Sequence, residues 1–393
     1  MKVLHIIPSL GPNRGGPSQV IIEMVAALRK LSIDAQIVTT NDNANALLDV
    51  PLFEPIQYNQ VPIRFFPKQR FPFHSLDEFL YCPQLTQWFN DNVSQYDLVH
   101  VHAIFSYVTT TAMCICQKKK VPYVIRPLGQ LCRWSLKQGY LKKKIYLSLV
   151  ERANLNGASG IHLTSDFEEA ELEDVQLKTK RFMIPNGFNP SARIDGAEKL
   201  LRNKLNLPEN TPTILFLSRL HPKKGLERLI SVLSLLKDLD FVFILAGSGS
   251  DEYEKKIGQL LIEAGIDHKT KRVGFVEGEL KMMLLQGANL FVLPSQSENF
   301  GVAALEALAS GTPVFITPDV GLSSMVENHN IGYVVRADAS EMEKQLRYCV
   351  GHLDELKQKG KKAREIVEEI YAWNKIVTDI VKMYDDILRS QHV

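Results

Sequence analysis

Two glutamates, Glu298 and Glu306, carry the most specific chemical signal in the chain, because seven residues separate them across an expected loop and helix. Glu298 follows an apolar run, and Glu306 lies within an apolar helix that Gly301 or Val302 begins. A carboxylate in such a helix must be paired or hydrogen-bonded. Vicinal sugar hydroxyls suit this role, because a carboxylate only accepts and a diol donates twice. An ion pair with a nearby Lys or Arg is the alternative for Glu306.

Backbone groups between the two acids add a second kind of contact. The N–H groups at the start of this helix are directed at any anion placed there, so the segment from Asn299 and Phe300 to Val302 is a candidate phosphate contact. The sequence thus combines hydroxyl and phosphate recognition within one short stretch.

Two cations follow another apolar run. Arg219 and Lys224 lie in the segment 218–225, just before an expected helix. Paired positive charges beside a helix start suit a diphosphate, which carries charge on both phosphates. A solvated basic loop is the alternative, and Lys223 is expected to be its solvated member.

Paired glycines, Gly15 and Gly16, follow the first apolar run. Glycine lets the backbone approach a ligand closely, and the following helix start again offers N–H groups to an anion. The spacing is not that of a dinucleotide-binding fingerprint. The alternative is a flexible loop with Ser18 as the helix cap.

Two histidines, His100 and His102, lie on one face of the expected strand 98–102, since side chains two residues apart point the same way. They lack a matching set of Asp, Glu or Cys ligands, so we expect no metal site. His102, at the end of the strand, could reach a ligand, whereas His100 could be structural. For either histidine alone, a structural role is the more common one.

The elements that position these groups form two series of short apolar runs alternating with helices. This pattern is typical of buried parallel strands. The sequence therefore predicts an α/β protein of two doubly wound, Rossmann-like domains whose strand ends face each other across a cleft. The boundary is expected between residues 186 and 212. The expected strands are Val3–Ile7, Ala35–Thr39, Leu98–His102, Val121–Arg126, Ile161–Thr164 and Phe182–Pro185, then Thr213–Ser218, Phe241–Ala246, Arg272–Phe275, Leu290–Pro294 and Val314–Thr317.

Composition excludes several classes. The chain has 393 residues, 45% of them hydrophobic and 23% charged, which is typical of a folded protein and not of a disordered one. A net charge of +2 and the lack of aromatics interleaved with basic residues argue against nucleic acid as a partner. The five cysteines are scattered and odd in number, so no disulfide framework is expected. No export or spanning segment is apparent, which favours a cytoplasmic location.

One segment is strongly basic. Residues 118–152 hold ten Lys and Arg and one acidic residue, a local net charge of +9. Leu141, Ile145 and Leu149 form an apolar stripe beside Lys142–Lys144. Such a segment either lies on anionic lipid, as a peripheral membrane contact at the cytoplasmic face, or is a solvated helix of its own domain.

Taken in order, these motifs resemble those of GT-B fold retaining glycosyltransferases of glycosyltransferase family 4, the glycosyl transferases group 1. The resemblance covers nearly the whole chain. Glu298 and Glu306 match the E-x7-E motif of the family, and the stretch from Asp97 to His102 matches its D-x-x-H-x-H pattern. The other matches are the phosphate-binding Arg219 and Lys224, the glycine loop Gly15-Gly16, and the turn Pro185-Asn186-Gly187.

The resemblance implies a role for each matched residue. Gly15 and Gly16 would meet the distal phosphate, and Arg219 and Lys224 would neutralise the diphosphate leaving group. Glu306 would hold the ribose, and His102 would contact the donor sugar near the reacting carbon. Glu298 and the backbone of Asn299, Phe300, Gly301 and Val302 would orient the donor sugar and the phosphates.

The implied activity is hexosyl transfer from a nucleotide sugar of the UDP or GDP type, without metal or other cofactor. The acceptor would be a saccharide or a lipid-linked saccharide, as in cell-surface polysaccharide biosynthesis. The implied domains are an acceptor-binding domain, 1–190 with 373–393, and a donor-binding domain, 191–372. Arg126-Pro127-Leu128-Gly129 departs from a Pro-Arg-Gly turn seen in members with polysaccharide acceptors. A UDP-N-acetylglucosamine 2-epimerase and a non-catalytic sugar-nucleotide-binding protein are the alternatives.

Overall fold

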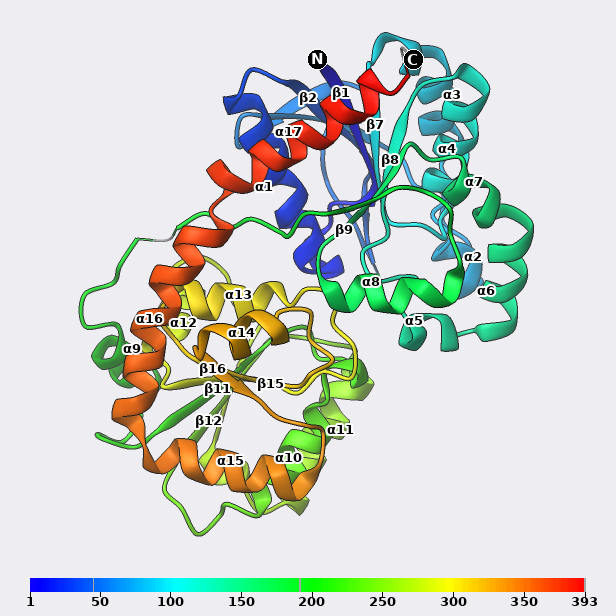
Figure 1. Ribbon diagram of the computed structural model, residues 1–393. Helices are drawn as coiled ribbons and strands as arrows, with labels where there is room; N and C mark the ends of the chain where they lie inside the picture. The colour runs from blue at the N-terminus through cyan, green and yellow to red at the C-terminus, as the bar shows by residue number, and fades with distance from the viewer. Residues whose placement is uncertain (45, 191, 392–393) are drawn as a thin grey trace. The chain divides into compact units, whose positions relative to one another are not determined.

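The computed structural model describes residues 1–44, 46–190 and 192–391. The chain forms two compact units (Figure 1). Unit 1 comprises Met1–Phe188 and Trp373–Val393, and unit 2 comprises Asn189–Ala372. The C-terminal segment thus returns to the N-terminal unit. The ranges expected from the sequence, 1–190 with 373–393 and 191–372, lie within two residues of these units.

Unit 1 is built on a mostly parallel sheet with the strand order β10-β9-β8-β7-β1-β2-β6-β5. Its strands are β1 Lys2–Ser9, β2 Asp34–Thr40, β5 Pro55–Tyr58, β6 Val61–Phe66, β7 Leu98–His102, β8 Tyr123–Arg126, β9 Gly160–Leu163 and β10 Arg181–Met183, with a separate pair β3 Asp42–Asn43 and β4 Ala46–Leu47. Its longer helices are α1 Gly16–Lys30, α3 Pro83–Asn92, α4 Tyr107–Lys119, α6 Tyr140–Tyr146, α8 Asp166–Leu172 and α17 Trp373–Arg389. Its shorter ones are η1 Pro12–Arg14, α2 His74–Asp77, η2 Val93–Gln95, α5 Arg133–Lys137, η3 Leu147–Glu151, α7 Arg152–Asn156 and η4 Glu173–Val175.

The sheet of unit 1 is buried on both faces, as a parallel sheet requires. Alternate residues of β7 show how: Val99 and Val101 pack in an apolar core that includes residues of α4, whereas His100 contacts Tyr384 of α17. From β1 the chain continues to β2 on one side, and β7 adds to β1 on the other. The chain order therefore reverses between β1 and β7, which makes this pair the topological switch point of unit 1.

Unit 2 repeats the plan with a parallel sheet of order β13-β12-β11-β14-β15-β16. Its switch point lies between β11 and β14, which pair directly. Its strands are β11 Thr213–Leu217, β12 Val242–Ala246, β13 Thr270–Gly274, β14 Leu290–Leu293, β15 Val314–Ile316 and β16 Gly332–Val334. Its helices are α9 Ala197–Leu205, η5 Pro222–Lys224, α10 Leu226–Ser234, α11 Asp251–Glu263, η6 Asp267–Lys269, α12 Gly278–Gly287, α13 Val302–Ala309, α14 Ser323–His329, α15 Ala339–Gly351 and α16 Leu353–Tyr371.

The α/β class and the two doubly wound sheets are confirmed, and each expected strand overlaps an observed one. Strands β5, β6 and β16 and the two-residue strands β3 and β4 were not predicted from the sequence. Phe53–Phe66 mixes polar residues and prolines, and β16 has only three residues, so neither shows a clean apolar run. Within the described residues, no helix combines the length and the apolar character that crossing a membrane needs.

Candidate functional site

In unit 2, the predicted residues follow the carboxyl ends of two neighbouring strands, β11 and β14, and the loop after the next strand, β15, packs beside them. Backbone hydrogen bonds join these loops: Gln296 N donates to Lys223 O at 2.8 Å, and Glu298 N donates to Asp319 O at 2.8 Å. Gly321 N returns a bond to Glu298 O, also at 2.8 Å. The loop that carries Glu298 is therefore held on both sides at the switch point of the sheet.

Lys224 and Glu298 form an ion pair there. Their side chains are 15% and 17% exposed, so the pair is largely shielded from water. Burial acts to raise the pKa of Glu298, but the Lys224 ammonium, with Lys223 and Arg219, outweighs it and holds that pKa below its ordinary value. Glu298 is thus a fixed anion at neutral pH.

The loop after β11 is strongly cationic. Arg219 is exposed, and Lys223 and Lys224 follow within η5, which His221 caps by accepting a bond from Lys223 N at 3.1 Å. Burial, and then Arg219, Lys224 and Lys223, lower the pKa of His221. The charges of Arg219, Lys223 and Lys224 thus create a positive field at His221, which an anionic ligand would neutralise.

Two glycines allow this close approach of loops. Gly225 has φ +72°, and a Cβ atom there would lie 2.1 Å from Pro294 O. Gly301 has φ +95° and is the N-cap of α13, as expected from the sequence. The positive φ values favour glycine, and at Gly225 the lack of a side chain also lets the β11 and β14 loops meet.

Glu306 lies on α13, one turn into the helix, and its side chain is 27% exposed. Its carboxylate accepts a hydrogen bond from Lys281 Nζ of α12 at 2.7 Å. The alternative given for Glu306, an ion pair with a nearby Lys or Arg, is therefore present, and the partner is Lys281. Of the other predicted residues of this segment, Phe300 is buried against Tyr371, and Val302 is the first residue of the helix.

In unit 1, Gly15 and Gly16 begin α1 directly after β1 and η1. Gly15 has φ +93° and is the N-cap, and a Cβ there would meet no described atom within 4 Å. Ser18 is not the cap, because the helix begins two residues earlier and its hydroxyl donates to Gly11 O at 3.4 Å. The backbone at Gly15 is therefore open to approach.

A charged network holds this glycine loop. Arg14 Nε donates to Asp42 at 2.7 Å and its Nη1 donates to Glu78 at 2.7 Å. Asp42 also accepts a bond from Lys68 Nζ at 2.9 Å, and both of these side chains are fully buried. Burial opposes ionisation of Asp42, but Arg14 and Lys68 keep its pKa below the ordinary value. No sequence pattern had indicated this network.

His102 ends β7, as predicted, but its side chain is fully buried. It belongs to a cluster with His5, His100 and His162, beside Arg126. Its Nε2 lies 3.0 Å from His5 Nδ1, and its Nδ1 has no hydrogen-bond partner among the described residues. His100 bonds to Tyr384, which agrees with the structural role considered for it.

Three of these histidines, His5, His100 and His102, have ring nitrogens within 4.8 Å of one another, which could in principle hold a metal ion. However, the hydrogen bond between His5 and His102 uses a nitrogen of each ring. The cationic side chain of Arg126 also acts on all three rings. Both observations favour a hydrogen-bonded cluster over a cation site.

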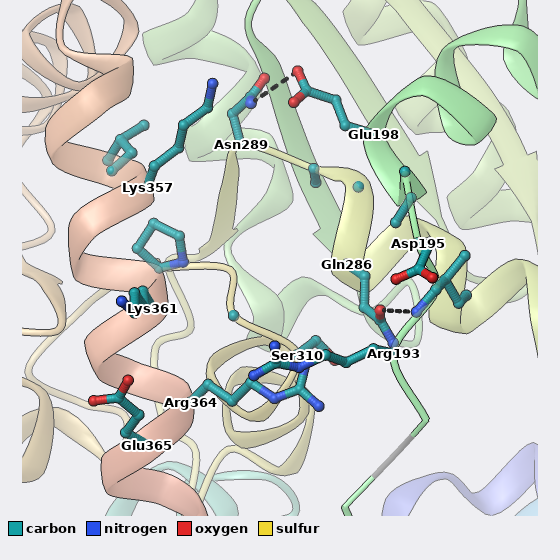
Figure 2. A pocket seen from close by; sticks show the side chains of 18 of the residues that line it. Arg193, Asp195, Glu198, Gln286, Asn289, Ser310, Lys357, Lys361, Arg364 and Glu365 are labelled. Carbon is teal, nitrogen blue, oxygen red and sulfur yellow. Dashed lines mark hydrogen bonds between the residues drawn. The ribbon is translucent and has the colours of Figure 1, made fainter.

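A cavity of about 470 Å³ lies elsewhere in unit 2 (Figure 2). Its lining includes Asn289 and Pro313, which precede β14 and β15, so it is at the opposite end of the sheet from Glu298. Its charged lining residues are of both signs: Arg193, Lys357, Lys361, Arg364, Asp195, Glu198, Glu365 and Glu368. None of the predicted site residues lines it.

Comparison with known proteins decides the family. The family model described as "Glycosyl transferases group 1" matches residues 197–367, and the model described as "Glycosyl transferase 4-like domain" matches residues 15–187. The chain belongs to the glycosyl transferases group 1 family. It is therefore an enzyme, a retaining glycosyltransferase that uses a nucleotide sugar, and the fold is GT-B.

Individual relatives are distant. The chain is 23% identical to a GDP-mannose:cellobiosyl-diphosphopolyprenol alpha-mannosyltransferase of Xanthomonas oryzae, over 99% of this chain and 97% of that protein. Among solved structures, a sucrose-phosphate synthase of Thermosynechococcus elongatus matches with a TM-score of 0.80 and 20% identity, covering 99% and 100% of the two chains. Anabaena HepE, in complex with UDP and glucose, matches with a TM-score of 0.77 and 21% identity, covering 98% and 100%.

Proposed function

We propose that this glycosyltransferase moves a hexosyl group from a UDP- or GDP-linked donor to a saccharide or lipid-linked acceptor, in the biosynthesis of cell-surface polysaccharide. The full-length relative with a diphosphopolyprenol acceptor and the structural neighbour bound to UDP and glucose support this proposal. The epimerase and the non-catalytic alternatives are not supported by the family matches.

The residues of unit 2 take the donor roles in this proposal. Arg219 and Lys224 neutralise the diphosphate, since cations fixed beside the start of α10 need little reorganisation when negative charge develops. Glu298, held ionised, orients the donor sugar through its hydroxyl groups, and the backbone of Asn299–Val302 contacts the phosphates. Glu306 exchanges its bond with Lys281 for bonds to the ribose hydroxyls.

The residues of unit 1 complete the donor contacts. The backbone at Gly15 and Gly16 contacts the distal phosphate, because the lack of a Cβ lets an anion approach the start of α1 closely; the Gly15 N–H itself donates to Pro12 O. His102 contacts the donor sugar through Nδ1, the nitrogen that has no hydrogen-bond partner in the part of the chain described.

Retention follows when the acceptor attacks from the face that the diphosphate leaves. The departing phosphate oxygen takes the acceptor proton, the bond from the anomeric carbon to that oxygen breaks, and the new glycosidic bond forms. Glu298 and Glu306 bind the donor in this scheme and form no covalent intermediate, unlike the nucleophile of a retaining glycosidase. The leaving group gains its stabilisation from Arg219, Lys224 and backbone dipoles.

The observation that carries the proposal is the position of the cationic loop after β11. The hydrogen bond from Gln296 N to Lys223 O and the Lys224–Glu298 ion pair join this loop to the Glu298 loop at the switch point. A thermal-shift screen with UDP, GDP and ADP and with their glucose and mannose conjugates tests it directly. We expect one nucleoside diphosphate to raise Tm, by linkage, and Arg219→Ala to reduce that rise. No shift with any of them, or an equal shift in Arg219→Ala, would contradict the proposed donor site.

A surface of α6 and η3 supports a peripheral membrane contact within residues 118–152. Leu141, Ile145 and Leu149 follow one another at four-residue spacing and are 68%, 51% and 77% exposed. Lysines 142–144 are interspersed among them, with Lys143 bonded to Ser135 O at 2.6 Å. We name these three apolar residues and the lysines the α6 surface. An exposed apolar stripe with interspersed cations fits the interface of an anionic bilayer, where a lipid-linked acceptor is found.

Flotation with liposomes of neutral lipid or of neutral lipid with anionic lipid tests the α6 surface. We expect salt-sensitive binding to the anionic liposomes and its loss in Leu149→Asp. Ile262→Asp is the matched control, because Ile262 on α11 is also exposed, at 59%, but lies in unit 2. Equal flotation of both variants, or no binding by the wild type, would contradict the membrane contact.

A further inference from the structure

The side chains around His102 form a polar layer across one face of the unit 1 sheet. The register pairs His5 of β1 with His100 of β7, and His102 with Arg126 of β8. His162 of β9 continues the layer, with its ring centroid 5.3 Å from that of His100. All five side chains are at most 1% exposed. This layer lies at the switch point between β1 and β7, two strands that lie side by side in Figure 1.

In the first chain of hydrogen bonds in this layer, the partners determine which ring nitrogens carry a proton. Ile184 O can only accept, so His162 Nε2, 2.7 Å away, carries a proton. Burial lowers the pKa of His162 to about 3, so the ring is neutral and its Nδ1 accepts from His100 Nε2 at 3.4 Å. His100 Nδ1 therefore accepts from the Tyr384 hydroxyl at 2.7 Å. This chain connects α17 to the sheet and ends without reaching His102.

The second chain has two members. His5 Nδ1 and His102 Nε2 lie 3.0 Å apart, which is a hydrogen bond that needs one proton between them. Burial, followed by the charge of Arg126, lowers the pKa of His5 to about 3, and burial also lowers that of His102. Both rings are therefore neutral, and each carries one proton, either on Nδ1 or on Nε2.

We propose that His5 is a positioning residue that ties the tautomer of His102 to its own: when His5 Nδ1 donates, His102 carries its proton on Nδ1, and when His5 Nδ1 accepts, His102 carries it on Nε2. The proposal rests on the proposed function, in which His102 Nδ1 contacts the donor sugar. A neutral imidazole that donates through one nitrogen must accept through the other. The proton of the His5–His102 bond therefore decides whether Nδ1 donates to or accepts from a sugar oxygen.

The two unpartnered nitrogens support this assignment. His5 Nε2 and His102 Nδ1 are both buried and have no hydrogen-bond partner among the residues that the structure describes. A buried polar atom without a partner costs stability, so such atoms are found mainly where a ligand or function requires them. His102 Nδ1 is therefore a nitrogen prepared for a ligand, and His5 is the only protein group that hydrogen-bonds to the other side of that ring in the described chain.

Substitutions of His5 separate its hydrogen bond from its volume. In His5→Asn, the side-chain amide lies close to the position of Nδ1, so the bond to His102 is retained. In His5→Gln, the amide lies near the position of Nε2 and the bond is lost, although the side chain stays polar and neutral. His5→Phe removes the bond and keeps a ring. Tyr384→Phe is the control, because it breaks the other chain and leaves the His5–His102 pair intact.

The main readout is the ¹⁵N chemical shift of the His102 ring nitrogens in protein labelled with [¹⁵N]histidine, assigned by comparison with His102→Ala. We expect the wild-type shifts in Tyr384→Phe and His5→Asn, and altered shifts in His5→Gln and His5→Phe, where the tautomer of His102 is no longer tied to residue 5. Unchanged shifts in folded His5→Gln would overturn the proposal. The Asn and Gln pair decides it even where His5→Phe does not fold.

Kinetics provide the second readout. We expect kcat of His5→Gln to fall about tenfold or more while the donor KM changes little, and His5→Asn to recover most of the loss. Wild-type kcat in His5→Gln, alongside a large loss in His102→Ala, would overturn the positioning role and leave the proposed function intact. Wild-type activity in His102→Ala would instead remove the assigned contact of His102 with the donor, and the positioning role with it.

Discussion

The cluster histidines at the switch point of unit 1 are neutral imidazoles without access to water, next to the buried Arg126, whereas the lysines and glutamates at the switch point of unit 2 retain partial exposure. Both sets follow parallel strands of the same type of sheet. In unit 1, burial lowers the pKa of each cluster histidine and keeps its ring uncharged. In unit 2, Lys224 overcomes the effect of burial and keeps Glu298 charged.

Gly15 of unit 1 and Gly225 of unit 2 differ in how closely other atoms approach them. Gly15 in unit 1 lies at an open helix start, whereas Gly225 in unit 2 contacts the backbone of the neighbouring loop. The described side chains of unit 2 at this point are therefore charged and lie in closely packed loops, whereas unit 1 combines an open glycine loop with neutral imidazoles. Burial alone does not decide the charge, because Asp42 and Lys68 of unit 1 are fully buried and stay ionised as a pair.

The largest effect is expected from the charged site of unit 2. Glu298→Gln removes the anion that we propose orients the donor, and it leaves Lys224 without its ion-pair partner. We expect kcat to fall about 100-fold to 1,000-fold, the size typical of losing one electrostatic group in an active site. Donor turnover in a purified transfer assay measures this, with Glu341→Gln on the exposed face of α15 as a control. A near-normal rate in Glu298→Gln would remove it from the site.

The two glycines provide a stability test of the same comparison. Gly225→Ala places a methyl group about where Pro294 O lies, and we expect it to destabilise unit 2 by about 3 kcal/mol. Gly15→Ala meets no described atom and should cost only backbone strain, about 2 kcal/mol, because its φ of +93° and ψ of −160° lie in a region that is essentially restricted to glycine. Urea unfolding of both variants measures the difference. Equal losses would show that the β11 and β14 loops are not closely packed.

The neutral cluster of unit 1 predicts acid sensitivity. A histidine with a pKa of 6.5 when unfolded and about 3 when folded binds its proton more readily in the unfolded state, so stability falls as the pH decreases from 6.5 towards 3. For His5 alone the loss by pH 5 is about 2 kcal/mol. Replacing His5 with Asn should reduce this slope. A slope that the substitution does not alter would show that the pKa of His5 is the same in the folded and unfolded states.

The smallest effect is expected at the second glutamate. Glu306→Gln retains a side chain that can accept hydrogen bonds from ribose, so we expect the donor KM to rise about tenfold with little change in kcat. Lys281→Met breaks the same ion pair but leaves the carboxylate, and should leave the donor KM near the wild-type value or below it. A drop in kcat as large as that of Glu298→Gln would give Glu306 a role in the transition state.

Much of this could be read from residue patterns. Apolar runs of four to eight residues located most strands, because a strand buried on both faces must be apolar almost throughout. Strand β16 and the β5–β6 hairpin were not predicted, because an edge or partly exposed strand does not show a continuous apolar run. The start of α13 was predicted at Gly301 or Val302, and the structure has Gly301 as the N-cap and Val302 as the first helical residue.

The partners of the site residues were not predictable in this way. Lys281 lies 25 residues from Glu306, His5 lies 97 from His102, and Arg14 lies 28 from Asp42. The local sequence determined which residues follow each strand and which chemistry they carry. Only the tertiary structure decided which of them meet, how deeply each is buried and therefore which are charged, because burial and ionisation depend on contacts between segments far apart in the chain.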